Sequence, residues 1–376
     1  MMQISEKQRT IRLTIIAGAR PNFMKIAPII HAIEKFNGNE KRIEYRLIHT
    51  GQHYDKNMSE TFFEELNIPM PDINLGVGGG TQAEQTAGIM IAFEKELTEH
   101  SADLVIVVGD VTSTMACSIV AKKLNTKVAH IEAGIRSWDL TMPEEINRMI
   151  TDCLTDYYFT TTELAGQNLR NAGAEDKQIF FVGNVMIDTL LANINRLVKP
   201  AIFDTLSLKE KEYIMLTLHR PANVDESDQL KALMNEIVAH VHGLPVIFPI
   251  HPRTAKIFSE LNIKADNLHI VDPMGYLEFN YLVKYSKAVI TDSGGITEET
   301  TVMNIPCITL RDNTERPETC TIGTNELIGT NPKAIKPTLD KLFSGNWKKG
   351  GIPELWDGKT AERIIQVISE LRIEVV

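Results

Sequence analysis

Acidic residues in two neighbouring segments have the types and spacing needed for proton transfer. Glu132 follows an apolar run over 128–131. Glu144 and Glu145 follow a proline, which presets φ for the first turn of a helix. In open α/β sheets the carboxyl ends of the strands border the crevice that binds ligands. Acids delivered there by separate elements suit general acid–base catalysis, although Glu144 and Glu145 fit the simpler role of stabilising a helix N-terminus equally well.

A third acid, Asp110, follows the apolar run over 104–108 with one glycine between them. An aspartate in such a turn between a strand and a helix commonly caps the helix. The same position places Asp110 near Glu132 in the crevice, where like charges raise the pKa of a carboxyl group. The sequence therefore indicates several carboxylates at one edge of a first sheet.

Two histidines end predicted strands in the second half of the chain. His219 precedes Arg220, and His251 follows the next apolar run. A histidine at the carboxyl end of a strand can donate a proton to a departing phosphate. Metal binding would need clustered ligands, and neither histidine has a partner four residues away or a neighbouring cysteine. The sequence therefore predicts no metal site.

Small residues after the run over 288–291 indicate a phosphate site. Ser293, Gly294 and Gly295 stand at the start of a predicted helix. Small residues let the backbone approach an anion, and a helix N-terminus offers unpaired N–H donors. A tight turn between strand and helix is the alternative. Glu299, one turn later, could accept a hydrogen bond from a ribose, but the G-x-G-x-x-G pattern of nicotinamide binding is absent.

Cations accompany these features. Arg20 and Lys25 follow the first predicted strand and suit the binding of a diphosphate, and Arg316 lies near the edge of the second half. The acids thus come mainly from the first half and the phosphate contacts mainly from the second. A nucleotide-sugar between the two halves fits this division, and domain closure would then exclude water.

The elements that must position these residues alternate in type, because short apolar runs are separated by amphipathic helical patterns. Such alternation predicts βαβ units and doubly wound parallel sheets. The pattern occurs twice, so we expect two Rossmann-like domains facing each other across a cleft, over residues 1–195 and 196–376. The last helix, near 359–371, is not assigned by pattern and could pack back on the first domain. The strands are expected over 13–17, 45–48, 104–108, 128–131, 157–160 and 179–182, and then over 213–218, 246–250, 268–271, 288–291 and 307–310.

Composition narrows the class of protein. The 376 residues carry a formal net charge of −10, which argues against nucleic acid or an anionic membrane as the main partner. The four cysteines are scattered without a Cys-x-x-Cys pair, as is typical of a reducing cytoplasm. The apolar N-terminal run is short and fits a strand better than a signal peptide, and no stretch is long enough to span a membrane.

Taken in order, these motifs resemble the non-hydrolysing UDP-N-acetylglucosamine 2-epimerases. The resemblance covers about residues 13 to 330 and rests on Gly18-Ala19-Arg20-Pro21, Gly109-Asp110, His130-Ile131-Glu132-Ala133-Gly134-Ile135-Arg136, Pro143-Glu144-Glu145-Ile146-Asn147-Arg148, Gly183-Asn184, His219-Arg220, Asp292-Ser293-Gly294-Gly295 and Thr314-Glu315-Arg316-Pro317. It implies the two-domain GT-B-type fold of many glycosyltransferases, a homodimer, and a UDP-sugar substrate with no metal or nicotinamide cofactor.

The resemblance also implies a reaction, the interconversion of UDP-GlcNAc and UDP-ManNAc. UDP is eliminated across C1–C2 to give a 2-acetamidoglucal and is then added back with the opposite configuration at C2. By resemblance, Asp110, Glu132 and Glu144 transfer protons, and His219 assists at the phosphate. The family's nucleotide-sugar contacts match Arg20, Lys25, Phe279 near the uracil, Ser293, Gly294, Gly295, Glu299 and Arg316.

Some members of this family bind a second UDP-GlcNAc as an activator. Gln52, Arg220 and His251 match that site, but Asp55 stands where a glutamine is common, and a glycine-rich loop over 76–80 replaces a segment that often carries arginine. Relatives that act on UDP-2,3-diacetamido-glucuronate or UDP-N-acetyl-6-deoxyhexoses share several of the same motifs. The competing hypotheses are a 2-epimerase that acts on one of these related substrates, a hydrolysing epimerase that releases ManNAc and UDP, a glycosyltransferase, and a non-catalytic sensor.

Overall fold

The computed structural model describes residues 9–51, 63–224, 226–250, 258, 263 and 265–371, without the side chains of Arg20, Pro221 and Ala222. The chain divides into two compact units. The first contains Met1–Thr189 and Glu354–Val376, and the second contains Leu190–Pro353. Each unit is built on one parallel sheet with helices between successive strands, so the prediction of two Rossmann-like α/β domains is confirmed.

Seven parallel strands form the sheet of the first unit, in the order β3-β2-β1-β4-β5-β6-β7. In the centre, β1 pairs with β2 on one side and with β4 on the other, so that Ile15 lies opposite Leu47 and Ile106. Every residue of β4 is at most 1% exposed, as expected for a parallel strand covered on both faces. The strands are β1 Ile11–Ala17, β2 Ile43–His49, β3 Ile73–Asn74, β4 Leu104–Val108, β5 Lys127–Ile131, β6 Tyr157–Thr160 and β7 Ile179–Phe181.

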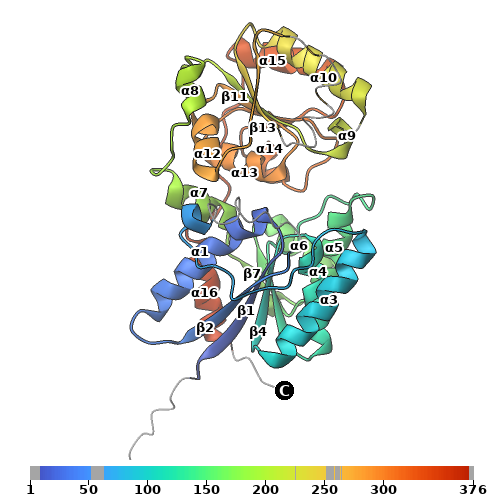
Figure 1. The fold of residues 1–376 in the computed structure, drawn as a ribbon, viewed down its shortest axis with the longest axis vertical. Coiled ribbons are helices and arrows are strands. Elements are labelled where there is room, and N and C mark those ends of the chain that lie inside the picture. Colours follow the sequence, from blue (N-terminus) through green and yellow to red (C-terminus); the bar gives the residue numbers. More distant parts are fainter. Residues whose placement is uncertain are drawn as a thin grey trace, which may run out of the picture. The chain divides into compact units, whose positions relative to one another are not determined.

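Helices cover both faces of this sheet. Figure 1 shows α1 and α16 on the face opposite α3 and α4. On the α3–α4 face, Val105 and Val107 of β4 pack in one apolar cluster with Phe93 and Val120. The helices of this unit are α1 Arg20–Asn37, α3 Gln82–Glu99, α4 Thr112–Lys123, α5 Pro143–Leu154, α6 Glu163–Asn171 and α16 Thr360–Glu370, with a 3-10 turn at Asp176–Gln178, and α7 Val185–Asn193 crosses into the second unit.

The C-terminal segment returns to the first unit through specific contacts. Asp188 of α7 accepts hydrogen bonds from the first backbone N–H groups of α16, those of Thr360 at 3.1 Å and Ala361 at 2.7 Å. These groups have no partner within their own helix, so the carboxylate satisfies them and complements the positive end of the helix dipole. The buried indole of Trp356 donates to the carbonyl of Thr161 at 3.2 Å. The last helix therefore packs on the first unit, against α1.

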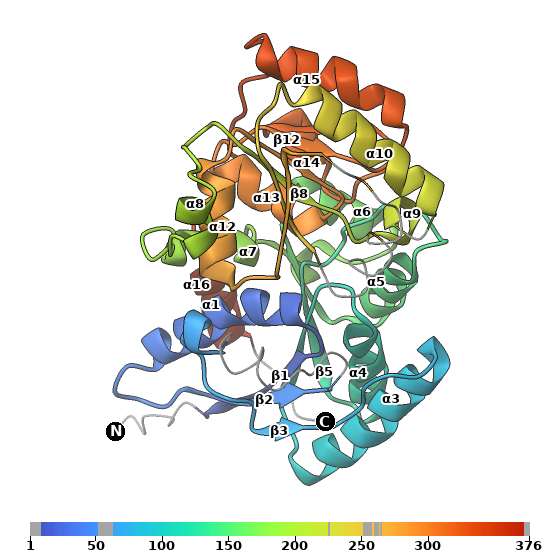
Figure 2. The same ribbon diagram turned by 45° about the horizontal axis from the view of Figure 1, so that its top comes forward.

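The sheet of the second unit has six parallel strands in the order β10-β9-β8-β11-β12-β13. Helices α10 and α15 pack against each other beside it (Figure 2). The strands are β8 Ile214–Thr217, β9 Val246–Pro249, β10 Leu268–Val271, β11 Ala288–Thr291, β12 Cys307–Thr309 and β13 Asn325–Leu327. The helices are α8 Ala201–Thr205, α9 Pro221–Val224, α10 Ser227–His240, α12 Tyr276–Tyr285, α13 Gly294–Val302, α14 Pro317–Thr321 and α15 Ile335–Phe343, with a 3-10 turn at Pro332–Ala334.

Strand order reverses once in each sheet, between β1 and β4 in the first unit and between β8 and β11 in the second. Open α/β sheets bind ligands beyond the carboxyl ends of the strands at such reversal points. The fold thus predicts that the loops after β1, β4, β8 and β11 carry ligand-binding residues. Within the described part of the chain, no helix has both the length and the apolar composition needed to cross a bilayer.

Candidate active site

The turn after β4 is held by side chains from four other segments, α1, α4, β5 and α5. The carbonyl oxygen of Val108 accepts hydrogen bonds from Asn22 at 3.1 Å and from Thr114 at 2.9 Å. The carbonyl of Gly109 accepts one from His130 at 2.8 Å, and that of Asp110 accepts one from Asn147 at 2.9 Å. Three successive carbonyls are therefore fixed, and with them the direction in which the Asp110 side chain leaves the chain.

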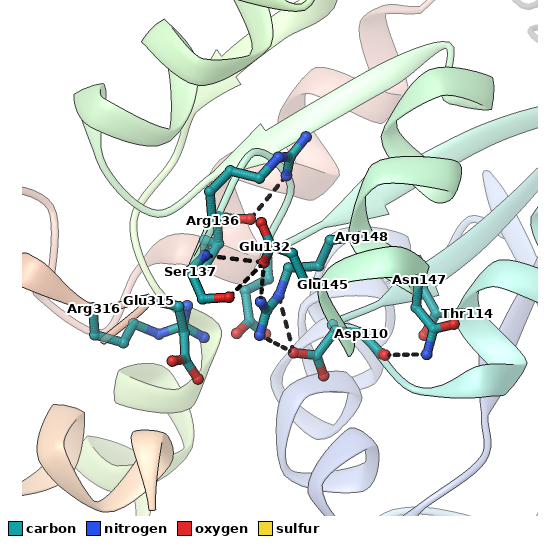
Figure 3. A network of polar contacts seen from close by, with 12 residues as sticks. Asp110, Thr114, Glu132, Arg136, Ser137, Glu145, Asn147, Arg148, Glu315 and Arg316 are labelled. Atoms are coloured by element: carbon teal, nitrogen blue, oxygen red, sulfur yellow. Dashed lines mark hydrogen bonds and ion pairs between the residues drawn. The ribbon is translucent and has the colours of Figure 1, made fainter. Parts of the chain in front are cut away.

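The Asp110 carboxylate lies against a buried arginine. Arg148, on α5, donates to Oδ2 of Asp110 from Nη2 at 2.6 Å and from Nε at 3.1 Å (Figure 3). The same guanidinium reaches Oε2 of Glu145 from Nη1 at 2.6 Å. The Asp110 side chain remains 27% exposed, whereas those of Arg148 and Glu145 are 4% and 0% exposed. Of these three groups, Asp110 is therefore the one that a ligand can reach.

Glu132 leaves the sheet through a distorted backbone. Its φ is +74°, and its N–H and that of Ala133 both donate to the carbonyl of Phe159, at 3.0 and 3.1 Å. The chain therefore turns directly after β5, and one carbonyl accepts from both residues of the turn. A positive φ in a residue with a side chain costs about 1–3 kcal/mol and persists where the surroundings impose it. The buried carboxylate forms an ion pair with Lys25, so an acid and a cation from the predicted set meet in the first unit.

Glu144 and Glu145 have different surroundings. Glu145 is fully buried and accepts hydrogen bonds from the N–H of Ser137 at 2.9 Å, the hydroxyl of Ser137 at 3.0 Å and the N–H of Trp138 at 3.1 Å. It therefore anchors the loop before α5. Glu144 is half-buried and forms no ion pair with another described residue. Of the two acids, Glu144 is the one whose carboxylate is not already used to hold the protein together.

In the second unit, His219 is held by a buried aspartate. Asp292, after β11, lies 2.8 Å from Nδ1 of His219 and also accepts hydrogen bonds from the backbone N–H groups of His219 and Arg220. Burial would raise the pKa of Asp292, but the hydrogen bond and charge of His219 and the amide of Asn223 outweigh it and lower the pKa. Since a carboxylate accepts hydrogen bonds, Nδ1 donates and Nε2 is the ring nitrogen that can exchange a proton with a ligand. The His219 side chain is 55% exposed, which keeps Nε2 accessible.

The N-terminus of α13 carries the predicted phosphate residues. Ser293 precedes the helix, and Gly294 and Gly295 are its first two residues, so their N–H groups have no partner within the helix. A Cβ on Gly294 would lie 3.1 Å from Oε1 of Glu315, whose other oxygen accepts a hydrogen bond from Arg311 at 2.6 Å. A side chain at Gly294 would therefore require the Glu315 carboxylate to shift by a few tenths of an ångström.

Glu299 lies deeper in the same helix and is buried with two polar partners. The hydroxyl of Tyr276 donates to Oε1 of Glu299 at 2.8 Å, and the amide of Asn280 donates to it at 3.5 Å. Burial raises the pKa of Glu299 to about 7, and the two hydrogen bonds offset this only in part. Arg316 pairs with the buried Glu298, the residue before Glu299 on α13. Phe279 of α12 packs against the apolar core of this unit.

Some predicted residues cannot be placed. Gln52, Asp55 and His251 lie outside the described residues, as does the side chain of Arg20. Arg220, the third residue of the predicted activator site, is half-buried with Nη2 3.9 Å from Glu315. An activator site stays a prediction.

Several residues that build the site were not predicted to hold other residues in place. Arg148, Glu145 and Asp292 lie inside the recognised motifs and Asn22 directly follows one, yet in the structure each of them holds other residues. One signal was available for α5, because Glu145, Arg148 and Asp152 recur at intervals of three and four residues and so share one face of a helix. All three are buried, while Ile146 and Met149 on the same helix are 45% and 43% exposed.

Comparison with known proteins identifies the family. The family model described as UDP-N-acetylglucosamine 2-epimerase matches residues 36–369. The chain belongs to the UDP-N-acetylglucosamine 2-epimerase family. The family resemblance predicted from the motifs is thereby confirmed.

Relatives within this family are similar over almost their whole length. The UDP-N-acetylglucosamine 2-epimerase of Methanocaldococcus jannaschii is 43% identical over 374 residues, covering 96% of this chain and 99% of that protein. The UDP-2,3-diacetamido-2,3-dideoxy-D-glucuronate 2-epimerase of Pseudomonas aeruginosa is 40% identical, covering 96% and 100%. High identity to both means that the family is clear while the choice of sugar within it is not decided by similarity.

Solved structures of family members have the same fold. The crystal structure of the M. jannaschii enzyme in complex with UDP-GlcNAc and UDP matches with a TM-score of 0.85 and 42% identity, covering 96% of this chain and 99% of that one. The Neisseria meningitidis UDP-GlcNAc 2-epimerase bound to UDP-GlcNAc matches with a TM-score of 0.87 and 28% identity, covering 96% and 100%. The predicted GT-B-type fold is confirmed by these 2-epimerases.

Proposed function

We propose that this chain catalyses the reversible epimerisation of UDP-GlcNAc to UDP-ManNAc at C2. The observation that carries the proposal is the full-length membership of the 2-epimerase family together with the motif acids of the first unit at the carboxyl edge of its sheet. An epimerase without a redox cofactor must break and re-form the C2–H bond, and carboxylates can carry the proton.

The proposed reaction proceeds by elimination and re-addition. A carboxylate removes the proton from C2, the electron pair forms the C1–C2 double bond, and the C1–O bond breaks so that UDP leaves with its bonding electrons. The intermediate is a 2-acetamidoglucal. Re-addition of the diphosphate oxygen to C1, with a proton delivered to the opposite face of C2, gives the epimer. Asp110, Glu132 and Glu144 share these proton transfers, and His219 assists at the phosphate through Nε2.

The nucleotide is assigned mainly to the second unit. The free N–H groups at the start of α13 suit the diphosphate, with Ser293, Gly294 and Gly295 leaving room for it. Glu299 is assigned to the ribose, Phe279 to the uracil and Arg316 to the diphosphate. From the first unit, Lys25 and Arg20 contribute positive charge.

A related UDP-2-acetamido sugar is the second candidate substrate. The 40% identity to the P. aeruginosa enzyme that acts on UDP-2,3-diacetamido-2,3-dideoxy-D-glucuronate supports it, because it is close to the 43% identity to the M. jannaschii UDP-GlcNAc enzyme. Both reactions need the same chemistry at C1 and C2 and differ in the substituents at C3 and C6.

Product analysis tests the proposal. The purified chain is incubated with UDP-GlcNAc, and separately with UDP-2,3-diacetamido-glucuronate, without added metal or NAD, and the products are separated by chromatography. UDP-ManNAc from UDP-GlcNAc supports the proposal. Free ManNAc with UDP would assign the chain to a hydrolysing reaction. Turnover of the diacetamido sugar alone would make that sugar the substrate in place of UDP-GlcNAc.

We also infer that the enzyme is a homodimer, as the family resemblance implies. The support in the structure is α5, which buries its polar face and exposes Ile146, Met149 and Cys153 on the other side. An exposed apolar side of a helix is unfavourable in water and is typical of a surface that binds a protein. Light scattering should give twice the mass of one chain, and Met149→Glu should give the mass of one chain. A native monomer would contradict the inference.

A further inference from the structure

His130 is a fully buried histidine with a close partner at each ring nitrogen. Its side chain is 0% exposed in the middle of the first sheet, on β5. Nδ1 lies 2.7 Å from Oδ1 of Asp152, and Nε2 lies 2.8 Å from the carbonyl oxygen of Gly109. The first partner comes from α5 and the second from the turn after β4, so one imidazole joins three elements of the unit.

Both partners are hydrogen-bond acceptors, and this fixes the number of protons on the ring. A backbone carbonyl only accepts, and an ionised carboxylate only accepts. A neutral imidazole has one N–H and one lone pair, so in either tautomer one of these contacts would bring a lone pair against an oxygen lone pair. Two such short contacts are satisfied together when both ring nitrogens carry a proton and the imidazole is a cation.

The groups around the pair supply the matching charge. Asp152 also accepts a hydrogen bond from the N–H of Gly134 at 3.1 Å and an ion pair with Arg136 at 2.6 Å. Burial would raise the pKa of Asp152, but the hydrogen bonds and charges of His130 and Arg136 outweigh burial and lower it. Tyr158, from β6, donates to the backbone carbonyl of Asp152 at 2.8 Å. A buried carboxylate with these donors stays ionised and can hold a charged imidazole.

We propose that His130 is a positioning residue, a doubly protonated imidazolium that joins Asp152 to the carbonyl of Gly109 and thereby fixes the turn that carries Asp110. The proposal rests on the proposed function, because the importance of that turn depends on Asp110 as a proton-transfer group. His130 is fully buried, and its contact with this turn is made through the carbonyl of Gly109. Its effect passes through one peptide group.

The Gly109 peptide needs such a restraint. Gly109 has φ of +68°, a left-handed conformation that favours glycine, and a Cβ there would lie 2.9 Å from Nζ of Lys25. A glycine lacks the side chain that would limit its own rotation. His130 holds the carbonyl of Gly109, and Asn147 holds the carbonyl of Asp110. Loss of the first bond would release the peptide that joins Gly109 to Asp110, while the carbonyl of Val108 would stay held by Asn22 and Thr114.

The protonation state is tested on the native protein. Histidine labelled with ¹⁵N is incorporated, and the ring nitrogens are observed by NMR at about pH 8, where an exposed histidine has lost its second proton. His130→Gln identifies the His130 signals among those of the ten histidines. Protonated shifts at both nitrogens of His130 support the proposal. An unprotonated shift at either nitrogen overturns it, and neither result depends on any enzymatic activity.

The positioning role is tested with two variants that keep opposite halves of the interaction. In His130→Gln the side-chain amide reaches the position of Nε2 and can still donate to Gly109. In His130→Asn the amide reaches the position of Nδ1 and can donate only to Asp152. We expect kcat to fall about tenfold in the first and about a hundredfold in the second, with KM changed little, since an error of about 1 Å in position costs on the order of 10² in rate.

A purely structural role predicts a different result. Both variants would then lose the same activity in proportion to their loss of folded protein, measured by thermal unfolding, and equal kcat values at equal folded fractions would overturn the proposal. The assay uses the UDP-sugar that the native chain turns over. If the native chain converts none, the proposed function fails, while the NMR result still decides the state of His130.

Discussion

Arg148 donates two hydrogen bonds to a single oxygen of Asp110, from Nη2 at 2.6 Å and from Nε at 3.1 Å. Charge-assisted bonds of this kind are short, and they orient the carboxylate. Because Arg148 also bonds Glu145, the position of Asp110 is linked to the loop that Glu145 anchors. Helix α5 therefore builds the site with its polar face, as its buried Glu145, Arg148 and Asp152 show.

Glu144 and Glu145 should respond differently to the same substitution. Glu144→Gln should lower kcat by about 10²–10⁴-fold, the usual contribution of a proton-transfer group, without changing the unfolding temperature. Glu145→Gln removes the charge opposite Arg148 in a buried site and should cost about 2–4 kcal/mol of unfolding free energy. Steady-state kinetics and thermal unfolding separate the two effects. Equal stability losses in both variants, or full activity in Glu144→Gln, would contradict the assignment.

Asp292 should act on the reaction only through His219. Asp292→Asn keeps the size of the side chain but removes the charge that holds Nδ1, and we expect kcat to fall by about a hundredfold. His219→Gln should cost at least as much. If the two residues act as one unit, the double variant is no slower than His219→Gln alone. If the fold losses of kcat in the two single variants multiply in the double variant, Asp292 has an independent role.

Glu299 should make the stability of the protein depend on pH. Its pKa is raised by burial to about 7 from an ordinary value of 4.5, so the folded state binds an extra proton between these values. The contribution of the neutral carboxyl to the free energy of unfolding is fully present below pH 4.5 and is lost as the pH rises through about 7. The loss is at most about 3 kcal/mol.

The control is Glu299→Gln, which cannot ionise and can still accept the Tyr276 hydrogen bond. Urea unfolding at about pH 5 and pH 8 should therefore show a larger loss of stability in the native chain than in this variant, because only the native carboxyl titrates over that range. Parallel losses in the two proteins would mean that Glu299 is not the group responsible.

The sequence predicted the fold well where the physical signal is periodic. The runs over 104–108, 157–160 and 288–291 coincide with β4, β6 and β11, because strands buried on both faces must be continuously apolar. The short edge strands β3 Ile73–Asn74 and β13 Asn325–Leu327 were not predicted, since neither contains a run of apolar residues. The return of α16 to the first unit depends on its contacts with Asp188, which lies far away in the sequence.

The candidate site was predicted only in part, for a related reason. Loops after the central strands carry Asp110, Glu132 and His219, and their place at the sheet edge follows from topology. The residues that hold them, such as Arg148 and Asp292, are defined by contacts across 38 and 73 residues of sequence. The local sequence pattern carries no information about such pairs. Only the structure shows which charged groups hold the site residues in place.

The central claim, that epimerisation proceeds by removal and return of the C2 proton, is tested most directly in D2O. The native chain is incubated with UDP-GlcNAc without metal or NAD, and proton NMR follows C2 of both epimers. The account predicts deuterium at C2 of the UDP-ManNAc that forms, and no deuterium with Glu132→Gln if that carboxylate is required. UDP-ManNAc that retains its original proton at C2 would contradict the proposed mechanism.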